Sequence, residues 1–477
     1  MISIFATTEH NKEVIQIIQR VDRLHELVNI HLFKDQLQIK PDLLVANQEI
    51  SLPLDWQDSR PPYLFPKQPL DADHLLSIVF FLLGNYQQAL SYQAESHPLH
   101  QHIRKATYLQ VAYPLSQKEM EDSQAENLHN FCIMAHYGQL SYDFDYAHLP
   151  KLYEQAIDNN SDLEKKTLTV KHYINFLLYT RQIERAESLL SHFLNLDLSP
   201  DARQALQVQQ ANLWMGKIKI PYDFQLLDRL EQLQEKCITY YEKQKQEIGA
   251  GLLLIDASEI ANIRKDFPRS MEKINRAIQY FRANETTEFL GEASLRKATL
   301  LYTWSKNGSP QYYKAAINAY QDALKVFSRD EFPQKFADIH HHLGVIYSEI
   351  PVGPDEKAIW AAFCASSFKE ALAFYQKENF PYEYAMVCHN YATALMGFPP
   401  AKMFNHLEKA RDLFEEALLV RQASHFPFER ALTLLNQLEL CWLLPPESLD
   451  QLHYQTMLEK AQEIQSLVDD ATILEKV

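Results

Sequence analysis

Histidines and cysteines are the side chains most able to do chemistry in this 477-residue chain, which holds 19 His and 5 Cys. His25-Glu26 begins like the H-E-x-x-H zinc motif, but Asn29 stands where the second histidine ligand is needed. Residues 340–342 are three consecutive histidines. On a helix such neighbours point about 100° apart, so at most two converge on one ion. We therefore expect no metal site.

Nucleophilic and nucleotide chemistry are equally poorly supported. Cys364 and Cys388 fall where helices are expected to pack, which predicts inert core thiols. Gly249-Ala-Gly251 lacks the third glycine of a dinucleotide fingerprint, and neither a P-loop nor a G-x-S-x-G motif occurs. A caspase-like protease domain would need more strands than residues 1–70 can supply. The sequence predicts no enzyme and no cofactor.

Charge and cysteine usage indicate the compartment and the class of partner. The chain has 46 Lys and Arg against 62 Asp and Glu, so its formal charge is 46 − 62 = −16, and no basic run occurs. Nucleic acid and anionic membranes are therefore unexpected partners. The cysteines are scattered, the longest apolar run, 78–83, is too short to span a bilayer, and Glu9 interrupts the apolar start. We expect an unanchored cytoplasmic protein.

Residues 1–70 differ from the rest of the chain. Alternating apolar residues predict strands at 1–6, 28–33, 37–39 and 50–54, with a helix at 12–27. Pro61, Pro62 and Pro66 then predict a linker. We expect a small α/β cap followed by helices, because the chain has only ten glycines and a helical apolar period from about residue 71 onward.

The helical part contains a regular repeat. Each unit carries a small residue, a large apolar residue four positions later and alanine three positions after that: Ser270/Ile274/Ala277, Ala316/Tyr320/Ala323, Cys364/Phe368/Ala371 and Ala410/Phe414/Ala417. The alanines are spaced 323 − 277 = 46, 371 − 323 = 48 and 417 − 371 = 46. Small residues at i and i+7 lie on one helix face and let a neighbouring helix approach closely.

A partner helix precedes the later anchors, at 337–347 and 385–395, and a Phe-Pro pair separates successive units at 332–333, 380–381 and 426–427. Proline ends the preceding helix and is tolerated in the first turn of the next. The repeating unit is therefore a helical hairpin.

These residues resemble the tetratricopeptide repeat (TPR) family. The resemblance is carried by Leu343-Gly344-x-x-Tyr347, by the Ala316/Tyr320/Ala323 pattern, by Gly84-Asn85-Tyr86 and by 180–186 with Pro200. It implies hairpins coiled into a right-handed superhelix with a concave binding face and no catalysis. The units exceed the family period of about 34 residues, so their helices or turns must be longer. Elongated units with Phe-Pro junctions look like those accompanying bacterial caspase-like (CHAT-type) proteases.

The expected organisation is an all-α solenoid with an α/β cap: cap 1–70, degenerate repeats 71–263, regular repeats 264–445, and a closing helix within 446–477, at about 449–468. The resemblance implies that the first helix of each hairpin lines the groove. The residues it places there are Arg296, His341 and His389, then Leu435 or Asn436, with His342 and Asn390 beside them at a position where asparagine often clamps a bound peptide. A solvated polar face is the alternative.

The function expected is that of a non-enzymatic scaffold or adaptor that binds a peptide or helical segment of another protein. If the groove histidines have ordinary pKa values near 6.5, an acidic partner should bind more tightly as pH falls. The alternative is a ligand-sensing regulatory subunit of a larger enzyme assembly, such as a partner of a caspase-like protease, in which residues 1–70 make the functional contact.

Overall fold

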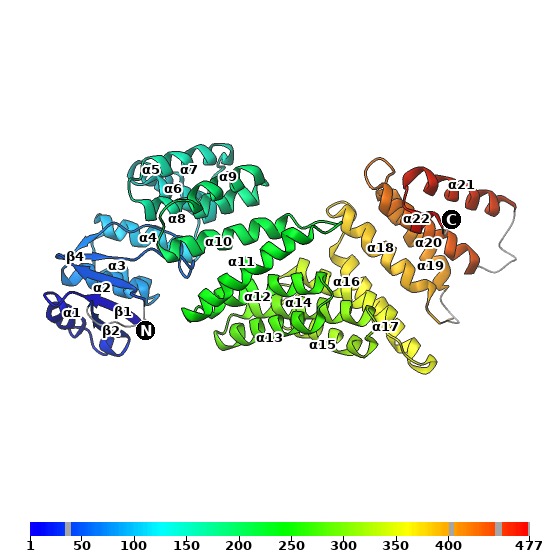
Figure 1. Ribbon diagram of the computed structural model, residues 1–477, viewed down its shortest axis with the longest axis horizontal. Helices are drawn as coiled ribbons and strands as arrows, with labels where there is room; N and C mark the ends of the chain where they lie inside the picture. The colour runs from blue at the N-terminus through cyan, green and yellow to red at the C-terminus, as the bar shows by residue number, and fades with distance from the viewer. Residues whose placement is uncertain (34–39, 400–404, 444–450, 476–477) are drawn as a thin grey trace. The chain divides into compact units, whose positions relative to one another are not determined.

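A computed structural model describes residues 1–33, 40–399, 405–443 and 451–475, without the side chains of 451–453. The chain divides into two compact units, 1–246 (unit 1) and 247–477 (unit 2). Helices dominate both, and the strands described form one sheet in unit 1 (Figure 1). The expected fold class, helical hairpins with a small N-terminal sheet, is confirmed.

The sheet has the strand order β2-β1-β3-β4-β5. Its strands are β1 (Ile2–Ala6), β2 (Val28–Leu32), β3 (Leu43–Ala46), β4 (Glu49–Ser51) and β5 (Gln68–Pro69). β1 is parallel to β2 and β3, whereas β4 is antiparallel to β3 and β5. β3 and β5 were not predicted, and the strand expected at 37–39 lies outside the described residues. The helix expected at 12–27 is shorter: α1 (Asn11–Ile18) is followed by the 3-10 turn η1 (Leu24–Glu26).

Helices α2 to α10 of unit 1 share one hydrophobic core with the sheet. They are α2 (Ala72–Leu82), α3 (Tyr86–Ser91), α4 (Pro98–Gln110), α5 (Gln117–Glu126), α6 (Leu128–Tyr137), α7 (Leu149–Asp158), α8 (Leu163–Tyr179), α9 (Ile183–Leu194) and α10 (Pro200–Gly216). The 3-10 turn η2 (Tyr146–His148) precedes α7, and α11 (Phe224–Lys243) packs against α10. One continuous cluster of buried residues runs from Ile2 in β1 through Val79 to Leu213 in α10. The sheet is therefore an integral part of unit 1.

Residues 52–67 connect β4 to β5 and leave the sheet as one long loop. This loop, named here the groove loop, lies against α4, α6 and α8 through side-chain contacts described below. The prolines that predicted a linker belong to this packed segment. The linker prediction was therefore wrong.

Unit 2 is an array of helical hairpins. The successive pairs are α12 (Glu247–Ile263) with α13 (Phe267–Ala283), α14 (Thr287–Lys306) with α15 (Tyr313–Leu324), α16 (Pro333–Glu349) with α17 (Pro354–Phe374), α18 (Pro381–Met396) with α19 (His406–Val420), and α20 (Pro427–Leu443) with α21 (Gln451–Leu467). A 3-10 turn, η3 (Pro310–Tyr312), precedes α15, and α22 (Ala471–Leu474) follows α21. α12 pairs with α13, so the hairpins of unit 2 include residues 247–263, which the sequence analysis assigned to the degenerate repeats.

The Phe-Pro pairs mark the helix starts, since α16, α18 and α20 begin at Pro333, Pro381 and Pro427. α16 and α17 are 17 and 21 residues long. In this hairpin the two helices alone, 17 + 21 = 38 residues, exceed the family period of about 34.

The small/large/small positions are the packing centre of the array. All twelve side chains that carry the pattern are 0 % exposed, from Ser270 to Ala417. A methyl group on Gly344 of α16 would lie 3.0 Å from three ring atoms of Phe368 in α17. The glycine thus lets the aromatic ring occupy the space between paired helices. The repeat register predicted from the sequence is confirmed.

Candidate functional site

Five of the six residues expected to bind a partner connect neighbouring first helices of unit 2. The first connection is an ion pair in which Nη1 of Arg296 on α14 lies 2.6 Å from Oε2 of Glu259 on α12. Both side chains are partly exposed. Burial raises the pKa of the neighbouring Asp256 to about 6, although Arg296 opposes that shift. Arg296 therefore already has a carboxylate partner.

The second connection joins α16 to α18. Nδ2 of Asn390 donates to Nε2 of His341 at 2.8 Å. His341 is 6 % exposed, and its ring lies beside that of Phe368. Burial, followed by the neighbouring His342, lowers the pKa of His341 to about 3. His341 is therefore a neutral core residue and does not project into an open groove.

The third connection joins α18 to α20 in the same manner. Nδ2 of Asn436 faces Nε2 of His389 at 3.4 Å, and Nδ1 of His389 lies 3.2 Å from Oγ1 of Thr433. That hydroxyl accepts from Arg421 and donates to the carbonyl oxygen of Glu429. Nδ1 of His389 therefore carries its proton, and Nε2 accepts. Burial, with Arg421 adding to it, lowers the pKa of His389 to about 3.

The helix starts settle the register that the sequence left open. Counting nine residues on from each starting proline gives His342, Asn390 and Asn436. The preceding position holds His341, His389 and Leu435 and belongs to the packed interface, since Leu435 is only 4 % exposed. His342 is partly buried, and its ring stacks on Tyr320 of α15 at a centroid distance of 5.6 Å. The partly exposed asparagines are the better candidates for partner contacts.

These pKa values contradict the prediction that protonation of His341 and His389 strengthens the binding of an acidic partner below pH 6.5. Removing a histidine from water disfavours its charged form, so His341 and His389 remain neutral well below pH 6.5. Arg296, the remaining cation of the set, is paired with Glu259. The row of six residues therefore does not become strongly cationic on mild acidification.

The low pKa of His341 predicts a loss of stability in acid. The unfolded chain takes up this proton near pH 6.5, whereas the folded chain does so near pH 3. Below pH 6.5 the unfolded state binds more protons, so stability falls as pH falls. We compare the free energy of unfolding in urea at pH 7.5 and at pH 5.0. Between these two pH values the His341→Gln protein should lose about 1–2 kcal/mol less of this free energy than wild type does. Equal losses in both proteins would contradict this assignment.

Unit 1 contains a second row of polar side chains, and this row holds the groove loop. Asn130 of α6 clamps the backbone of Leu64: the Leu64 N–H donates to its Oδ1 at 2.8 Å, and its Nδ2 donates to the Leu64 carbonyl at 2.9 Å. His129 lies 2.9 Å from the carbonyl oxygen of Pro62. Because that oxygen can only accept, Nε2 of His129 carries the proton. Burial lowers the pKa of His129 to about 4. Two adjacent residues of α6 therefore form hydrogen bonds with the loop backbone.

The neighbouring helices add a charged and an aromatic contact. Nζ of Lys171 on α8 donates to the carbonyl oxygen of Trp56 at 3.1 Å and to Oδ1 of Asp58 at 2.6 Å. Lys171 is 3 % exposed, so this buried cation is neutralised by a carboxylate of the loop. The Tyr63 hydroxyl lies 2.9 Å from Nδ1 of His102 on α4. The loop is thus bound across three alternate helices.

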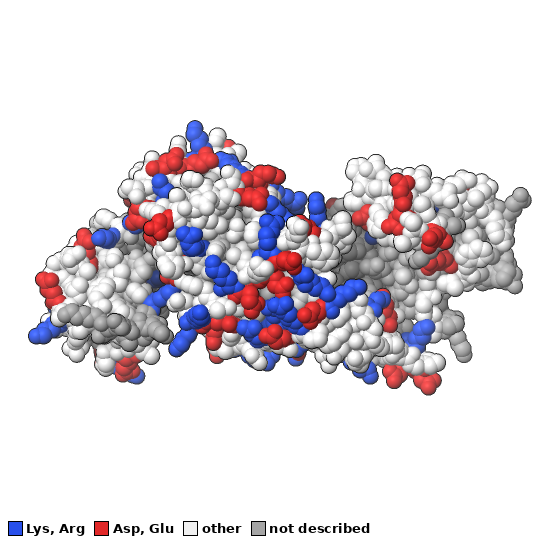
Figure 2. Space-filling view, in the orientation of Figure 1, with Lys and Arg blue, Asp and Glu red and all other residues white. Residues whose placement is uncertain are grey.

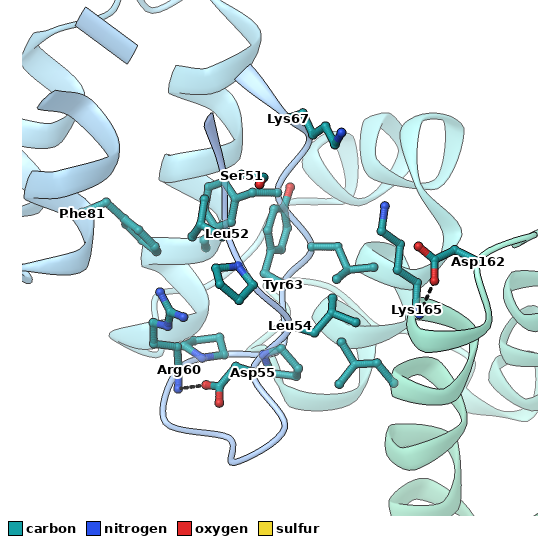
Figure 3. A pocket seen from close by; sticks show the side chains of 17 residues that line it. Ser51, Leu52, Leu54, Asp55, Arg60, Tyr63, Lys67, Phe81, Asp162 and Lys165 are labelled. Atoms are coloured by element: carbon teal, nitrogen blue, oxygen red, sulfur yellow. Dashed lines mark hydrogen bonds between the residues drawn. The ribbon is translucent and has the colours of Figure 1, made fainter. Parts of the chain in front are cut away.

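Cavities flank the groove loop. One of about 270 Å³ lies between the loop, Phe81 of α2, Ala106 of α4 and Leu168 of α8. Figure 3 shows Leu52, Leu54 and Tyr63 from the loop around this cavity, with Phe81 reaching it from the opposite side. A second, of about 330 Å³, is lined by loop residues 58–62 and by Tyr137, His172 and Asn175. Nε2 of His172 is buried and has no hydrogen-bond partner in the described structure.

Sequence reasoning missed the residues that hold this loop. The sequence signal that could have found them is a polar residue at a buried helical position. His129 and Asn130 precede the apolar run 131–135, and Lys171 lies between Val170 and Tyr173. A buried lysine or asparagine needs a partner. Such positions point to contacts that a helical pattern alone does not show.

We also searched the part of the chain that the structure describes for metal sites, reactive cysteines and membrane-spanning helices. No group of three His, Cys, Asp or Glu side chains there could hold a metal ion. All five cysteines are buried and free, and burial raises the pKa of Cys388 to about 11 and that of Cys364 to about 12. None of the described helices is long and apolar enough to cross a membrane. Figure 2 shows cations interspersed with anions on the face drawn.

Comparisons with known proteins add little to this geometry. No family model matches the chain, and no curated protein matches it. Among solved structures, the crystal structure of the APC/C hetero-tetramer Cut9-Hcn1 aligns with a TM-score of 0.33 and 12% identity, covering 85% of this chain and 82% of that chain. A TM-score this low carries no argument. The fold assignment rests on the hairpins, and no match supports the likeness to repeats that accompany caspase-like proteases.

Proposed function

We propose that this chain is a non-enzymatic protein-interaction module whose first helices in unit 2 bind an extended segment of another protein. The proposed contact surface contains Arg296, His342, Asn390 and Asn436, with His341 and His389 supporting it from beneath. Thr393 and Glu439 lie one turn after the two asparagines and are exposed. They extend the surface toward solvent.

The observation that carries this proposal comes from unit 1. There Asn130 of α6 holds the backbone of Leu64 through both polar atoms of its side-chain amide, since Oδ1 accepts from the Leu64 N–H and Nδ2 donates to the Leu64 carbonyl oxygen. Asn390 and Asn436 are presented by successive first helices of unit 2, and their described hydrogen bonds use only Nδ2. Each Oδ1 is therefore available to accept from the backbone N–H of a partner. Recognition of this kind depends on backbone geometry more than on charge, so an acidic partner is not required.

Site-specific photo-crosslinking in the native host tests the proposal. A photoreactive residue is placed at Thr393 or Glu439 on the first helices, and at exposed Lys369 or Arg411 on the second helices as matched controls. We expect one partner to cross-link at both first-helix positions, through one contiguous stretch of its chain, and at neither control. Equal cross-linking of that partner from both helix faces would contradict the proposal.

A further inference from the structure

We propose that the helices of unit 1 form a second peptide-binding groove, occupied in cis by residues 55–65 of the groove loop. In trans, the groove accepts a proline-containing segment of another protein that adopts the same turn, in which Asp55 accepts from the N–H groups of Gln57 and Arg60, and that carries a carboxylate five residues before a tyrosine. This site is separate from the one proposed in unit 2, so either proposal can fail without the other.

The contacts resemble those of a bound ligand. Hydrogen bonds from His129, Asn130 and Lys171 reach main-chain atoms of Trp56, Pro62 and Leu64. Main-chain contacts hold the backbone in place and carry no side-chain specificity, as in other modes of peptide recognition. The adjacent prolines, 61 and 62, restrict the backbone in advance and lower the entropy lost on binding.

Side-chain specificity comes from two loop residues. Asp58 neutralises buried Lys171, and Tyr63 inserts a ring that is 7 % exposed while its hydroxyl contacts His102. The spacing between them is 63 − 58 = 5 residues. A competing segment must supply both groups, because buried Lys171 would otherwise lose its carboxylate partner and partly buried His102 would lose its hydroxyl partner.

The groove loop is placed so that it can leave without disturbing the sheet. Its ends are joined by the antiparallel β4–β5 pair, Glu49 with Pro69 and Ile50 with Gln68. Pockets of about 270 and 330 Å³ that open to solvent flank this loop. Residues 57–59 at the tip are exposed. The loop therefore borders solvent at its tip and at both pockets.

Replacement of the loop tests the groove directly. Residues 52–66 are replaced by Asn-Gly, which closes a two-residue hairpin between Ser51 and Lys67 in the existing register. A fluorescent peptide of residues 52–66 is then titrated against this protein and against wild type. We expect saturable binding to the loop-replaced protein and at least about 10-fold weaker binding to wild type, because a tethered competitor has an effective concentration near millimolar.

Altered peptides provide the controls. N-methylation of Leu64 removes the donor to Asn130, and Asp58→Ala removes the partner of Lys171, so each should weaken binding by about 10-fold or more. Gln57→Ala, at the exposed tip, should bind like the parent peptide. A folded loop-replaced protein that does not bind the parent peptide, or that binds the N-methylated peptide equally well, would overturn the proposal.

If the loop-replaced protein fails to fold, amide hydrogen exchange of the wild-type protein tests whether the groove loop can leave the groove. We expect the Leu64 amide, which donates to Asn130, to exchange through a local opening, faster than amides of α6 and α8. Exchange of Leu64 only at the rate of global unfolding would show that the loop is a permanent part of the core, and would overturn the proposal.

Discussion

Replacing Phe368 with alanine is expected to lower the free energy of unfolding of unit 2 by about 3–5 kcal/mol. Phe368 is 0 % exposed, lies against Gly344 of α16 and stacks on Tyr391 of α18 at a centroid distance of 5.0 Å. Its removal would leave a cavity where α16, α17 and α18 meet. Urea unfolding followed by circular dichroism measures the change.

Phe363→Ala is the matched control for this prediction. Phe363 lies on the same helix and is 51 % exposed. Its replacement should cost less than about 1 kcal/mol, as is usual for exposed positions. Similar losses in the two variants would show that Phe368 is not a packing centre.

Replacing Ala371 with phenylalanine is expected to destabilise unit 2 by about 1–3 kcal/mol through overpacking. Ala323 occupies the equivalent position one repeat earlier, and both are 0 % exposed. Ala323→Phe should therefore have an effect of the same size. Thermal unfolding of both variants measures it.

Ala362→Phe, on an exposed position of α17, is the control for added volume. It should change the melting temperature little, because the new ring can remain in solvent. If Ala362→Phe and Ala371→Phe lower the melting temperature equally, the small-residue positions are not where helices approach most closely.

The repeat could be predicted because its signal is local. Close packing of two helices requires small side chains seven residues apart, as at Cys364 and Ala371, and proline restricts where a helix can begin. Both requirements can be read from one stretch of chain. The anchors and the starts of α16, α18 and α20 were therefore predicted correctly.

The burial and the lowered pKa of the histidines could not be predicted, because both depend on residues far apart in the chain. His341 meets Asn390 49 residues later, and burial between the two helices shifts its pKa. The stretch with Pro61, Pro62 and Pro66 was assigned to a linker because a proline-rich linker and a proline-rich segment packed on helices have the same composition. β3 was missed because its partner β1 lies about forty residues earlier.

The continuous core of unit 1 limits how a functional contact made by residues 1–70 can be tested. Deleting residues 1–70 would remove buried side chains from β1 to Tyr63 that pack with the helices. Loss of partner binding after that deletion would follow from unfolding of unit 1 alone. Point changes and the loop replacement separate the alternatives better.

Removing residues 324–371 tests the central claim that unit 2 is an array of equivalent hairpins with one continuous first-helix face. This deletion joins Ala323 to Leu372, so the end of α17 continues α15 in register. Each unit of such an array contacts only its neighbours, so the remaining hairpins should still pack. Deletion of 324–369 is the matched control. It joins Ala323 to Glu370 and so leaves two extra residues, which rotate the rest of the helix by about 200°.

Circular dichroism and urea unfolding of the 324–371 deletion protein should show a soluble, helical chain that unfolds cooperatively, whereas the 324–369 deletion protein should not. Aggregation of the in-register deletion, or equal behaviour of the two deletions, would contradict the account.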